Sequence, residues 1–121
     1  PVTVGPDITI TDFVENYVYK FHYKMFPVVK DNAVLGFVTA NKIRDILKEE
    51  WDNKYVGDIM SEFNEENTLS PDTDTLEALN VMKEKEMTRL LVIDNLNLKG
   101  IITLKDLLDF LTLKKELEGI G

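Results

Sequence analysis

Three polar side chains in the second half of the sequence are of types that could bind a small polar ligand. Thr103 and Asp106 lie three residues apart where a strand is expected to meet a helix, and Arg89 directly precedes the apolar run at residues 90–93. A hydroxyl, a carboxylate and a guanidinium can together hydrogen-bond to hydroxyl and phosphate groups. Threonine and aspartate at a helix start are also ordinary caps, and arginine on an acidic chain is also an ordinary ion-pair partner. These residues predict either a binding site or local structural roles.

The rest of the sequence contains no combination of residues typical of an active site. His22 is the sole histidine and cysteine is absent, which excludes a disulfide scaffold and a thiolate zinc site. No nucleophile with a base, no pair of catalytic carboxylates and no set of metal ligands can be identified. We therefore predict that this chain is not an enzyme and has no cofactor or metal of its own. His22 is expected at a helix end or an interface.

The composition is that of a soluble globular chain. Of its 121 residues 44% are hydrophobic and 30% are charged, with a net charge of −8. A core can form at this length, and the acidic charge argues against nonspecific binding to nucleic acid or anionic membranes. Residues 19–24 mix aromatic and basic side chains, as nucleic-acid surfaces do, but the overall charge favours core packing with lysine stems along the surface. No stretch approaches the roughly 18 apolar residues of a membrane span.

The sequence contains an internal duplication. The following pairs share an offset of 64 positions: residues 26–29 with 90–93, Gly36 with Gly100, and Thr39 with Thr103. Upstream, Pro6 and Asp7 recur 65 positions later as Pro71 and Asp72. The first repeat therefore has one extra residue, which is expected in or just after its first helix.

Each repeat is expected to form a strand, a helix, two strands and a second helix. Thr9 and Asp74 are in N-cap positions ahead of the first helix of each repeat. The apolar runs at residues 26–29 and 90–93 lack polar alternation, which predicts strands buried on both faces and covered by helices. The second helix is expected to run from about residue 104 towards 118, and in the first repeat to carry an apolar stripe: Ile43, Ile46 and Leu47. The predicted fold class is α/β in the wider sense, an α+β arrangement of two β-α-β-β-α motifs.

We expect the first motif and its connector to occupy residues 1–55, and the second motif residues 56–121. The connector at residues 48–54 is charged, and its Trp51 is expected to anchor it against a repeat. Residues 56–60 form a short helical lead-in to the second motif. No copy of this lead-in precedes the first motif, so the first motif is expected to have lost its lead-in together with an upstream part of a larger protein.

The order of these features resembles the CBS motif, the cystathionine-β-synthase-type domain. The resemblance covers essentially the whole chain and is carried best by Asp58-Ile59-Met60 and by the segment from Gly100 to Asp106, Gly-Ile-Ile-Thr-Leu-Lys-Asp. It implies a tandem pair, or Bateman module, in which two motifs pack by pseudo-twofold symmetry. It also implies a homodimer of such modules, and an adenine nucleotide bound in a cleft between the motifs.

The resemblance also implies which residues would contact the nucleotide. Asp106 matches the family's ribose-binding carboxylate, which can accept from both hydroxyls, and Thr103 matches its hydroxyl donor to phosphate. Amides at the helix start would face the phosphate, and Arg89 is placed to meet it. The adenine pocket is implied at four further positions: Ile59, Met60, Thr68 and Leu69. The apolar members of this set are more often plain core.

The first repeat departs from the pattern. It keeps Thr39, but Lys42 stands where the carboxylate is expected, and Met25 stands where the second repeat has Arg89. A lysine ammonium cannot accept from a ribose diol. We therefore expect at most one nucleotide site per chain, with AMP, ADP, ATP or S-adenosylmethionine as its ligand. The alternative is a structural module that dimerises its parent and binds no ligand.

A finer resemblance concerns the parent protein. The aromatic and basic helix end at residues 19–23, the Glu49-Glu50-Trp51 connector and the segment at residues 106–117 are similar to the CBS pair of the site-2 protease family of membrane zinc metalloproteases. It implies that the module is a soluble, cytoplasm-facing domain that partners and regulates a membrane catalytic domain. The zinc and its His-Glu-x-x-His helix would then lie in that domain, since neither is in this chain.

Overall fold

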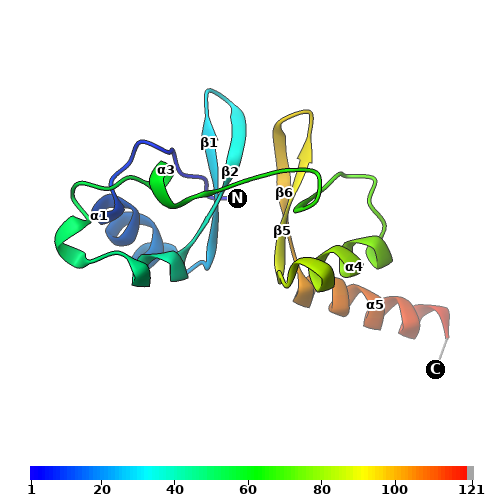
Figure 1. The fold of residues 1–121 in the computed structure, drawn as a ribbon. Helices are drawn as coiled ribbons and strands as arrows, with labels where there is room; N and C mark the ends of the chain where they lie inside the picture. The colour runs from blue at the N-terminus through cyan, green and yellow to red at the C-terminus, as the bar shows by residue number, and fades with distance from the viewer. Residues whose placement is uncertain (120–121) are drawn as a thin grey trace. The chain divides into compact units, whose positions relative to one another are not determined.

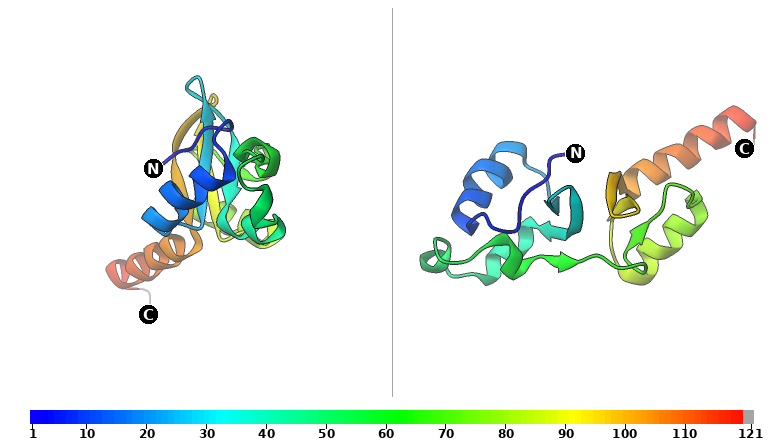
Figure 2. Two further views of the ribbon diagram at one scale, coloured as in Figure 1. Left: turned by 90° about the vertical axis from the view of Figure 1, so that its left-hand side faces the viewer. Right: turned by 90° about the horizontal axis from the view of Figure 1, so that it is seen from above.

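The computed structural model describes residues 1–119 and divides into two compact units, Pro1–Phe63 and Asn64–Gly121 (Figure 1). Each unit contains a three-stranded sheet with helices, as the predicted α+β class requires. Within each unit the helices lie on one side of its central hairpin, which can be followed in Figures 1 and 2. The two units are described in turn.

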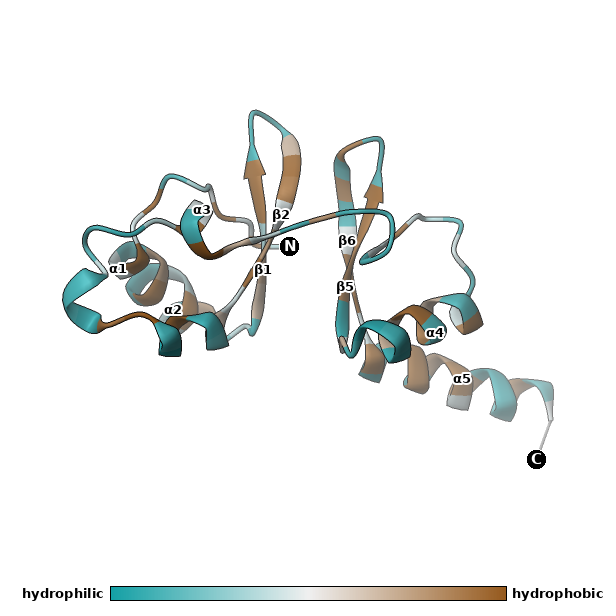
Figure 3. Cartoon of the chain, in the orientation of Figure 1, coloured by the Kyte–Doolittle hydropathy of each residue, from teal (hydrophilic) through white to brown (hydrophobic). Residues whose placement is uncertain are grey.

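The sheet of the first unit is built around a hairpin of β1 (Met25–Lys30) and β2 (Ala33–Thr39). A short strand, β3 (Ser61–Glu62), pairs antiparallel with the outer edge of β2, so the order is β1-β2-β3. On the other side, Val4 forms an isolated parallel bridge to Val28 of β1. Most of β1 and β2 is hydrophobic and the turn between them is hydrophilic, as Figure 3 shows.

The first helical segment of this unit contains a π-helical turn. It runs through α1 (Ile10–Phe13), the π turn Val14–Val18 and α2 (Tyr19–Phe21), and it is capped by Thr9, whose side chain accepts from the Asp12 amide. A π turn closes i→i+5 bonds, here from the Tyr19 amide to the Val14 carbonyl, so it holds one more residue than an α-helical turn. This turn is where the extra residue of the first repeat is accommodated, as the change of offset predicted.

The core of the first unit is aromatic and aliphatic. Phe13 and Phe26 are fully buried and meet edge to face, with ring centroids 5.3 Å apart. They pack with further buried residues: Val4, Val28, Val38 and Val56. A smaller cluster of Ile10, Val14 and Ile46 receives the Trp51 ring, whose Nε1 donates to the Ile46 carbonyl at 3.3 Å. The predicted anchoring of the connector by Trp51 is therefore confirmed.

The prediction of an α-helix after β2 in the first repeat is wrong. Residues Ala40–Asp45 form a 3₁₀ helix, Ile46 returns to extended backbone, and Leu47 is 62% exposed. The Thr39 hydroxyl donates to the Asn41 side chain at 2.6 Å and caps no backbone amide, so the first turn lacks an N-cap bond. A second 3₁₀ turn, Lys48–Glu50, and α3 (Val56–Ile59) complete the unit.

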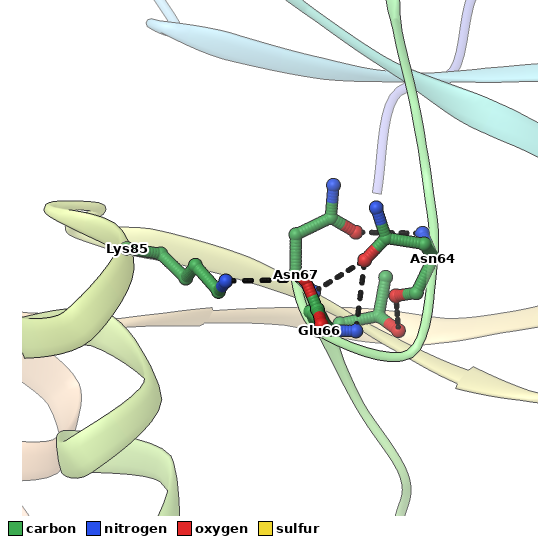
Figure 4. Close-up of polar contacts among 5 residues, drawn as sticks. Asn64, Glu66, Asn67 and Lys85 are labelled. Carbon is green, nitrogen blue, oxygen red and sulfur yellow. Dashed lines mark hydrogen bonds and ion pairs between the residues drawn. The ribbon is translucent and has the colours of Figure 1, made fainter.

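The second unit begins with a loop held by asparagine side chains (Figure 4). Asn64 Oδ1 accepts from the amides of Glu66 and Asn67, and Lys85 pairs with Glu66 at 3.3 Å. Its elements are β4 (Thr68–Leu69), α4 (Thr75–Lys85), β5 (Arg89–Asp94), β6 (Asn97–Thr103) and α5 (Leu104–Glu118). β4 runs parallel to β5 and β6 antiparallel to it, giving the order β4-β5-β6.

The two helices of the second unit begin where the sequence predicts. Asp74 caps α4 by accepting from the Glu77 amide at 2.9 Å. The core beneath them contains the buried residues Leu69, Ala78, Met82, Leu90 and Leu107. The prediction that residues 90–93 are buried on both faces holds only for its first half, because Leu90 and Leu91 are buried whereas Val92 and Ile93 are half-exposed.

The two hairpins share one register. Met25 faces Thr39 as Arg89 faces Thr103, and both ladders shift by one residue at matching places, between Val28 and Val29 and between Val92 and Ile93. Both two-residue turns have positive φ at both positions, Asp31 and Asn32 in the first and Asn95 and Leu96 in the second. The duplication is therefore reproduced down to the turn backbone.

The compact units and the sequence repeats divide at different places. The predicted second motif includes residues 56–63, but α3 and β3 pack within the first unit, where Val56 is part of the core and β3 lies on β2. The predicted boundary at residue 55 separates the two sequence repeats, and it stays a prediction.

Candidate functional site

The start of α5 is built by a threonine cap. Thr103 ends β6 with extended backbone, and its Oγ1 accepts from the Asp106 amide at 3.0 Å. The bond satisfies one of the amides that a helix start leaves open. The remaining amides of the first turn and the partial positive charge of the helix end favour a nearby anion. The cap expected of Thr103 is thus present, and it occupies a lone pair of the hydroxyl oxygen but not its hydrogen.

An open hollow of about 390 Å³ lies beside this helix start, within the second unit. Its wall joins the beginning of β5 to the first two turns of α5, which are held together by a 2.8 Å bond from the Leu104 amide to the Thr88 carbonyl. Seven residues line it: Thr88, Arg89, Thr103, Leu104, Lys105, Leu108 and Asp109. Two of the predicted site residues, Arg89 and Thr103, are therefore brought together.

Cations dominate the charge of the hollow. Arg89 is half-buried, and its guanidinium donates to the Thr88 hydroxyl at 3.1 Å. Lys105 pairs with Asp109 one helical turn later at 2.7 Å, and the hydrogen bond and the charge of Asp109 raise the pKa of Lys105. Both side chains of this ion pair are well exposed, so the pair is weak. Another anion can therefore replace Asp109 as the partner of Lys105. The chemistry offered is that of an anion site with an apolar side formed by Leu104 and Leu108.

The remaining predicted residues of the second unit do not line this hollow. Asp106 is exposed on the first turn of α5. Thr68 is half-exposed, and its hydroxyl donates to the Asn64 carbonyl at 2.8 Å, so it is engaged with the loop before β4. Leu69 is buried in the core and pairs with Val92 of β5. For Leu69 the structure gives a core role.

Ile59 and Met60 belong to the other unit. Both are half-buried and pack against the core that contains Phe13 and Phe26. Both therefore pack as ordinary core residues of the first unit. Their predicted part in an adenine pocket stays a prediction.

The matching position in the first unit has different chemistry. Met25 is buried where the second unit has Arg89, and Lys42 is exposed where it has Asp106. Thr39 keeps its place at the end of the strand, but the helix after it is a 3₁₀ helix of six residues. A short 3₁₀ segment without a cap offers less organised amides than the 15-residue α5.

Sequence reasoning missed three polar residues of the hollow, Thr88, Lys105 and Asp109. Helical periodicity could have identified two of them, since positions 105 and 109 share the face that follows a cap at 103. Thr88 precedes Arg89 at the helix-to-strand turn, and only the pairing of β5 with β6 brings it to the start of α5. Its place therefore depends on strand register, which no local pattern displays.

Neither a metal cluster nor a spanning helix is found where the chain is described. Over residues 1–119, no three histidine, cysteine, aspartate or glutamate side chains are grouped closely enough to hold an ion. Over the same residues, no helix combines the length and the apolar character that crossing a bilayer requires.

Comparison with known families identifies both repeats. The family model described as CBS domain matches residues 1–49 and residues 56–113. Among curated proteins, the inosine-5'-monophosphate dehydrogenase of Bifidobacterium longum is 32% identical over 111 residues, which cover 88% of this chain and 19% of that protein. The chain thus spans about a fifth of the length of the curated relatives it matches.

Solved structures with a similar fold include other CBS domains. The CBS domain of a bacterial CNNM/CorC family Mg²⁺ transporter in complex with ATP has a TM-score of 0.77 at 18% identity, covering 89% of this chain and 76% of that one. A CBS-domain containing protein from Agrobacterium tumefaciens has a TM-score of 0.75 at 21% identity, covering 90% and 87%. At these identities the likeness is one of fold.

Proposed function

Because this chain belongs to the CBS domain family, with one copy in each repeat, we propose that it is a regulatory module that senses an adenine nucleotide through its second repeat. The observation that carries the proposal is the hollow at the start of α5, where Arg89 and Thr103 meet beside an exposed helix start. The first repeat has Met25 and Lys42 at the matching positions. One nucleotide per chain follows from this difference.

Each group of the second repeat has a defined task in this proposal. Arg89 donates to phosphate oxygens, and the Thr103 hydroxyl donates its hydrogen while its oxygen still accepts from the Asp106 amide. The exposed Asp106 carboxylate accepts from the two ribose hydroxyls. Lys105 turns from Asp109 towards a longer phosphate chain, which replaces one exposed ion pair by another.

Regulation follows only if the nucleotide binds two states of the module with different affinities. The ATP complex of the transporter CBS domain is a precedent of shared fold, since that domain was solved with ATP bound. For the present chain we propose ATP, ADP or AMP as the ligand in preference to S-adenosylmethionine. The reason is charge: the sulfonium of S-adenosylmethionine would approach Arg89 and Lys105, which repel it.

Calorimetric titration of the purified chain with AMP, ADP, ATP and S-adenosylmethionine tests the proposal. We expect saturable binding of a phosphorylated nucleotide with one site per chain. Arg89→Met, which copies the first repeat, should weaken it at least about tenfold, and Asp106→Ala should weaken every ribose-containing ligand. Met25→Leu is the matched control and should leave binding unchanged. Absence of any response at millimolar nucleotide would overturn the proposal.

The second candidate is a structural module that dimerises its parent and binds no ligand. It is favoured by the exposed apolar side chains of α5, which lie outside the core of the unit: Leu108, Phe110, Leu113 and Leu117. This module would give a homodimer by sedimentation whose melting temperature does not respond to nucleotides. Dimerisation and sensing are compatible, so the melting response, measured on the dimer, separates the two candidates.

The attached effector is a separate part of the proposal. The resemblance at residues 19–23, 49–51 and 106–117 predicts a membrane zinc metalloprotease, with this module as its soluble, cytoplasm-facing partner. The curated relative named above is a dehydrogenase, so the protease rests on those residues alone. The sequence of the polypeptide around the module tests it: apolar spans with His-Glu-x-x-His would support the prediction, and a soluble catalytic domain would contradict it.

A further inference from the structure

A surface of the first unit gathers aromatic and basic side chains at residues 19–24, which span the last helical turn, α2, and the three residues after it. Tyr19 is 65% exposed and Tyr23 is 50% exposed, so two tyrosine rings lie largely in solvent. The three basic side chains of the segment, two lysines and a histidine, are exposed as well. We call residues 19–24 the basic aromatic surface. Aromatic side chains are enriched in protein interfaces, which makes this surface a candidate for a contact.

The rings of this surface are held in place by packing. Tyr23 stacks on Phe21 with ring centroids 5.7 Å apart, and its ring centroid lies 5.9 Å from that of the fully buried Phe26. His22 ends the helix with a left-handed backbone, φ 61°, which turns the chain between the two stacked rings. The Lys20 ammonium lies over the Phe21 ring, 5.4 Å from its centroid. A partner would therefore meet a preformed surface, and binding would immobilise few additional side chains.

The charge of the basic aromatic surface is opposite to that of the chain. The chain has 22 acidic residues and a net charge of −8, yet none of the acids lies between Glu15 and Asp31. Over residues 1–119 the lysine ion pairs are formed by Lys30, Lys85 and Lys105, so the two lysines of this surface have no carboxylate partner. Over the same residues, the hydroxyls of its two tyrosines form no hydrogen bond. The surface therefore presents ammonium and hydroxyl groups that are free to donate.

We propose that the basic aromatic surface docks a short acidic segment of a partner protein, with carboxylates on the lysines and tyrosine hydroxyls and an apolar side chain against the stacked rings. Carboxylates accept hydrogen bonds without donating any, which complements free donors. A membrane or a nucleic acid matches less well, because the rest of this acidic chain repels an extended anion, whereas a short segment meets only the local charge. This inference goes beyond the proposed sensing function and does not depend on nucleotide binding.

Selection of displayed random peptides of about 12 residues on the purified chain tests the proposal. A parallel selection uses the double variant Lys20→Glu, Lys24→Glu, in which the charge of the surface is reversed. We expect the chain to enrich peptides that are rich in aspartate and glutamate and carry at least one large apolar residue, and the double variant to enrich none of these. Backbone amide shifts during NMR titration with a synthetic copy of a selected peptide should map to residues 19–24.

Affinities of single variants for the synthetic peptide form the second arm. Lys24→Gln and Tyr23→Ala should each weaken binding about tenfold, and Tyr23→Phe, which keeps the ring and removes the hydroxyl, should weaken it less. Lys48→Gln removes an exposed lysine of the same unit outside the surface, and as the matched control it should leave binding unchanged.

Four results would overturn the proposal. They are the absence of acidic peptides from the selection, amide shifts that map outside residues 19–24, unchanged affinity in Lys24→Gln, and tighter binding at this surface of single-stranded oligothymidylate or phosphatidylserine vesicles than of the peptide. Melting curves of each variant show that it is folded. Because Lys24→Gln and Tyr23→Phe leave the ring packing in place, they decide the matter even if Tyr23→Ala unfolds.

Discussion

The two repeats share a hairpin and differ where the next helix begins. The register, the one-residue shift and the positive-φ turns of β1–β2 recur in β5–β6. After the hairpin, Thr103 caps the 15-residue α5, whereas Thr39 bonds to Asn41 and is followed by a 3₁₀ helix. The comparison teaches that the two copies share one strand framework, whereas only the second has a side-chain cap at the start of the following helix.

The difference in chemistry follows the difference in structure. A helix start binds an anion through open amides and a neighbouring cation, and the second repeat has both in α5 and Arg89. The first repeat has the buried Met25 and an uncapped short helix. Conversely, β3 covers the outer edge of β2, whereas within the described residues β6 is the last strand of its sheet. The first copy thus has an additional strand on its sheet, and the second has a capped helix after its hairpin.

The largest expected effect concerns the two glycines. Gly36→Ala should destabilise the chain by roughly 1–3 kcal/mol, because its methyl group overlaps the Ser61 carbonyl and β3 must shift. Gly100→Ala should be neutral or slightly stabilising, since it fills open space and restricts the unfolded chain. Urea denaturation followed by circular dichroism compares them. Equal losses for both variants would refute the difference between the two strand edges.

The two threonine positions should differ by less. Thr103→Ala removes the bond to the Asp106 amide and should cost about 1 kcal/mol, a usual value for an N-cap. Thr39→Ala should stay within about 0.5 kcal/mol, because Thr39 caps no amide. Thermal melts of both single variants are the measurement. A greater loss for Thr39→Ala would show that the first repeat depends on its helix start more than the second.

The hairpin turns allow a stabilising exchange. Leu96 has φ of 69°, a left-handed conformation that costs leucine more than asparagine, which stands at the counterpart position 32. Leu96→Asn should therefore raise the stability of the second unit by roughly 0.5–1 kcal/mol. Asn32→Leu, the reverse exchange, should lower that of the first unit by a similar amount. Denaturant midpoints of both variants decide, and a loss in Leu96→Asn would be contrary to this account.

The smallest effect concerns the ion pair on α5. Asp109 raises the pKa of Lys105, so the folded chain holds that proton more tightly than the unfolded chain does. The contribution of the pair is present at neutral pH and is lost at alkaline pH, as the pH rises through the raised pKa. Asp109→Asn should return the Lys105 pKa towards its ordinary value in an NMR titration. An unchanged pKa in Asp109→Asn would show that the pair does not persist in solution.

Local signals predicted much of the fold. Caps at Thr9 and Asp74, strands at the apolar runs and the 64-residue offset depend on neighbouring residues and on the duplication, and each is reproduced, although Val92 and Ile93 are less buried than predicted. The extra residue was located because two offsets can be compared, and it forms the π turn Val14–Val18.

What could not be predicted depends on pairing between distant segments. β3 has only two residues, and no pattern in Ser61 and Glu62 indicates that they lie on β2. The 3₁₀ helix after Thr39 was missed because the spacing of Ile43, Ile46 and Leu47 suits an α-helix, whereas the cap that would start one is absent. The hollow needed Thr88 next to α5, which follows from strand register.

The central claim is that the second repeat alone holds a nucleotide, and mapping of backbone amide shifts during titration with ATP tests it most directly. We expect shifts that saturate at the second-repeat positions Thr88, Arg89, Thr103, Lys105 and Asp106. The first-repeat counterparts Met25, Thr39 and Lys42 should not move. Saturating shifts of equal size in both sets, or no shift in either at millimolar ATP, would contradict the account.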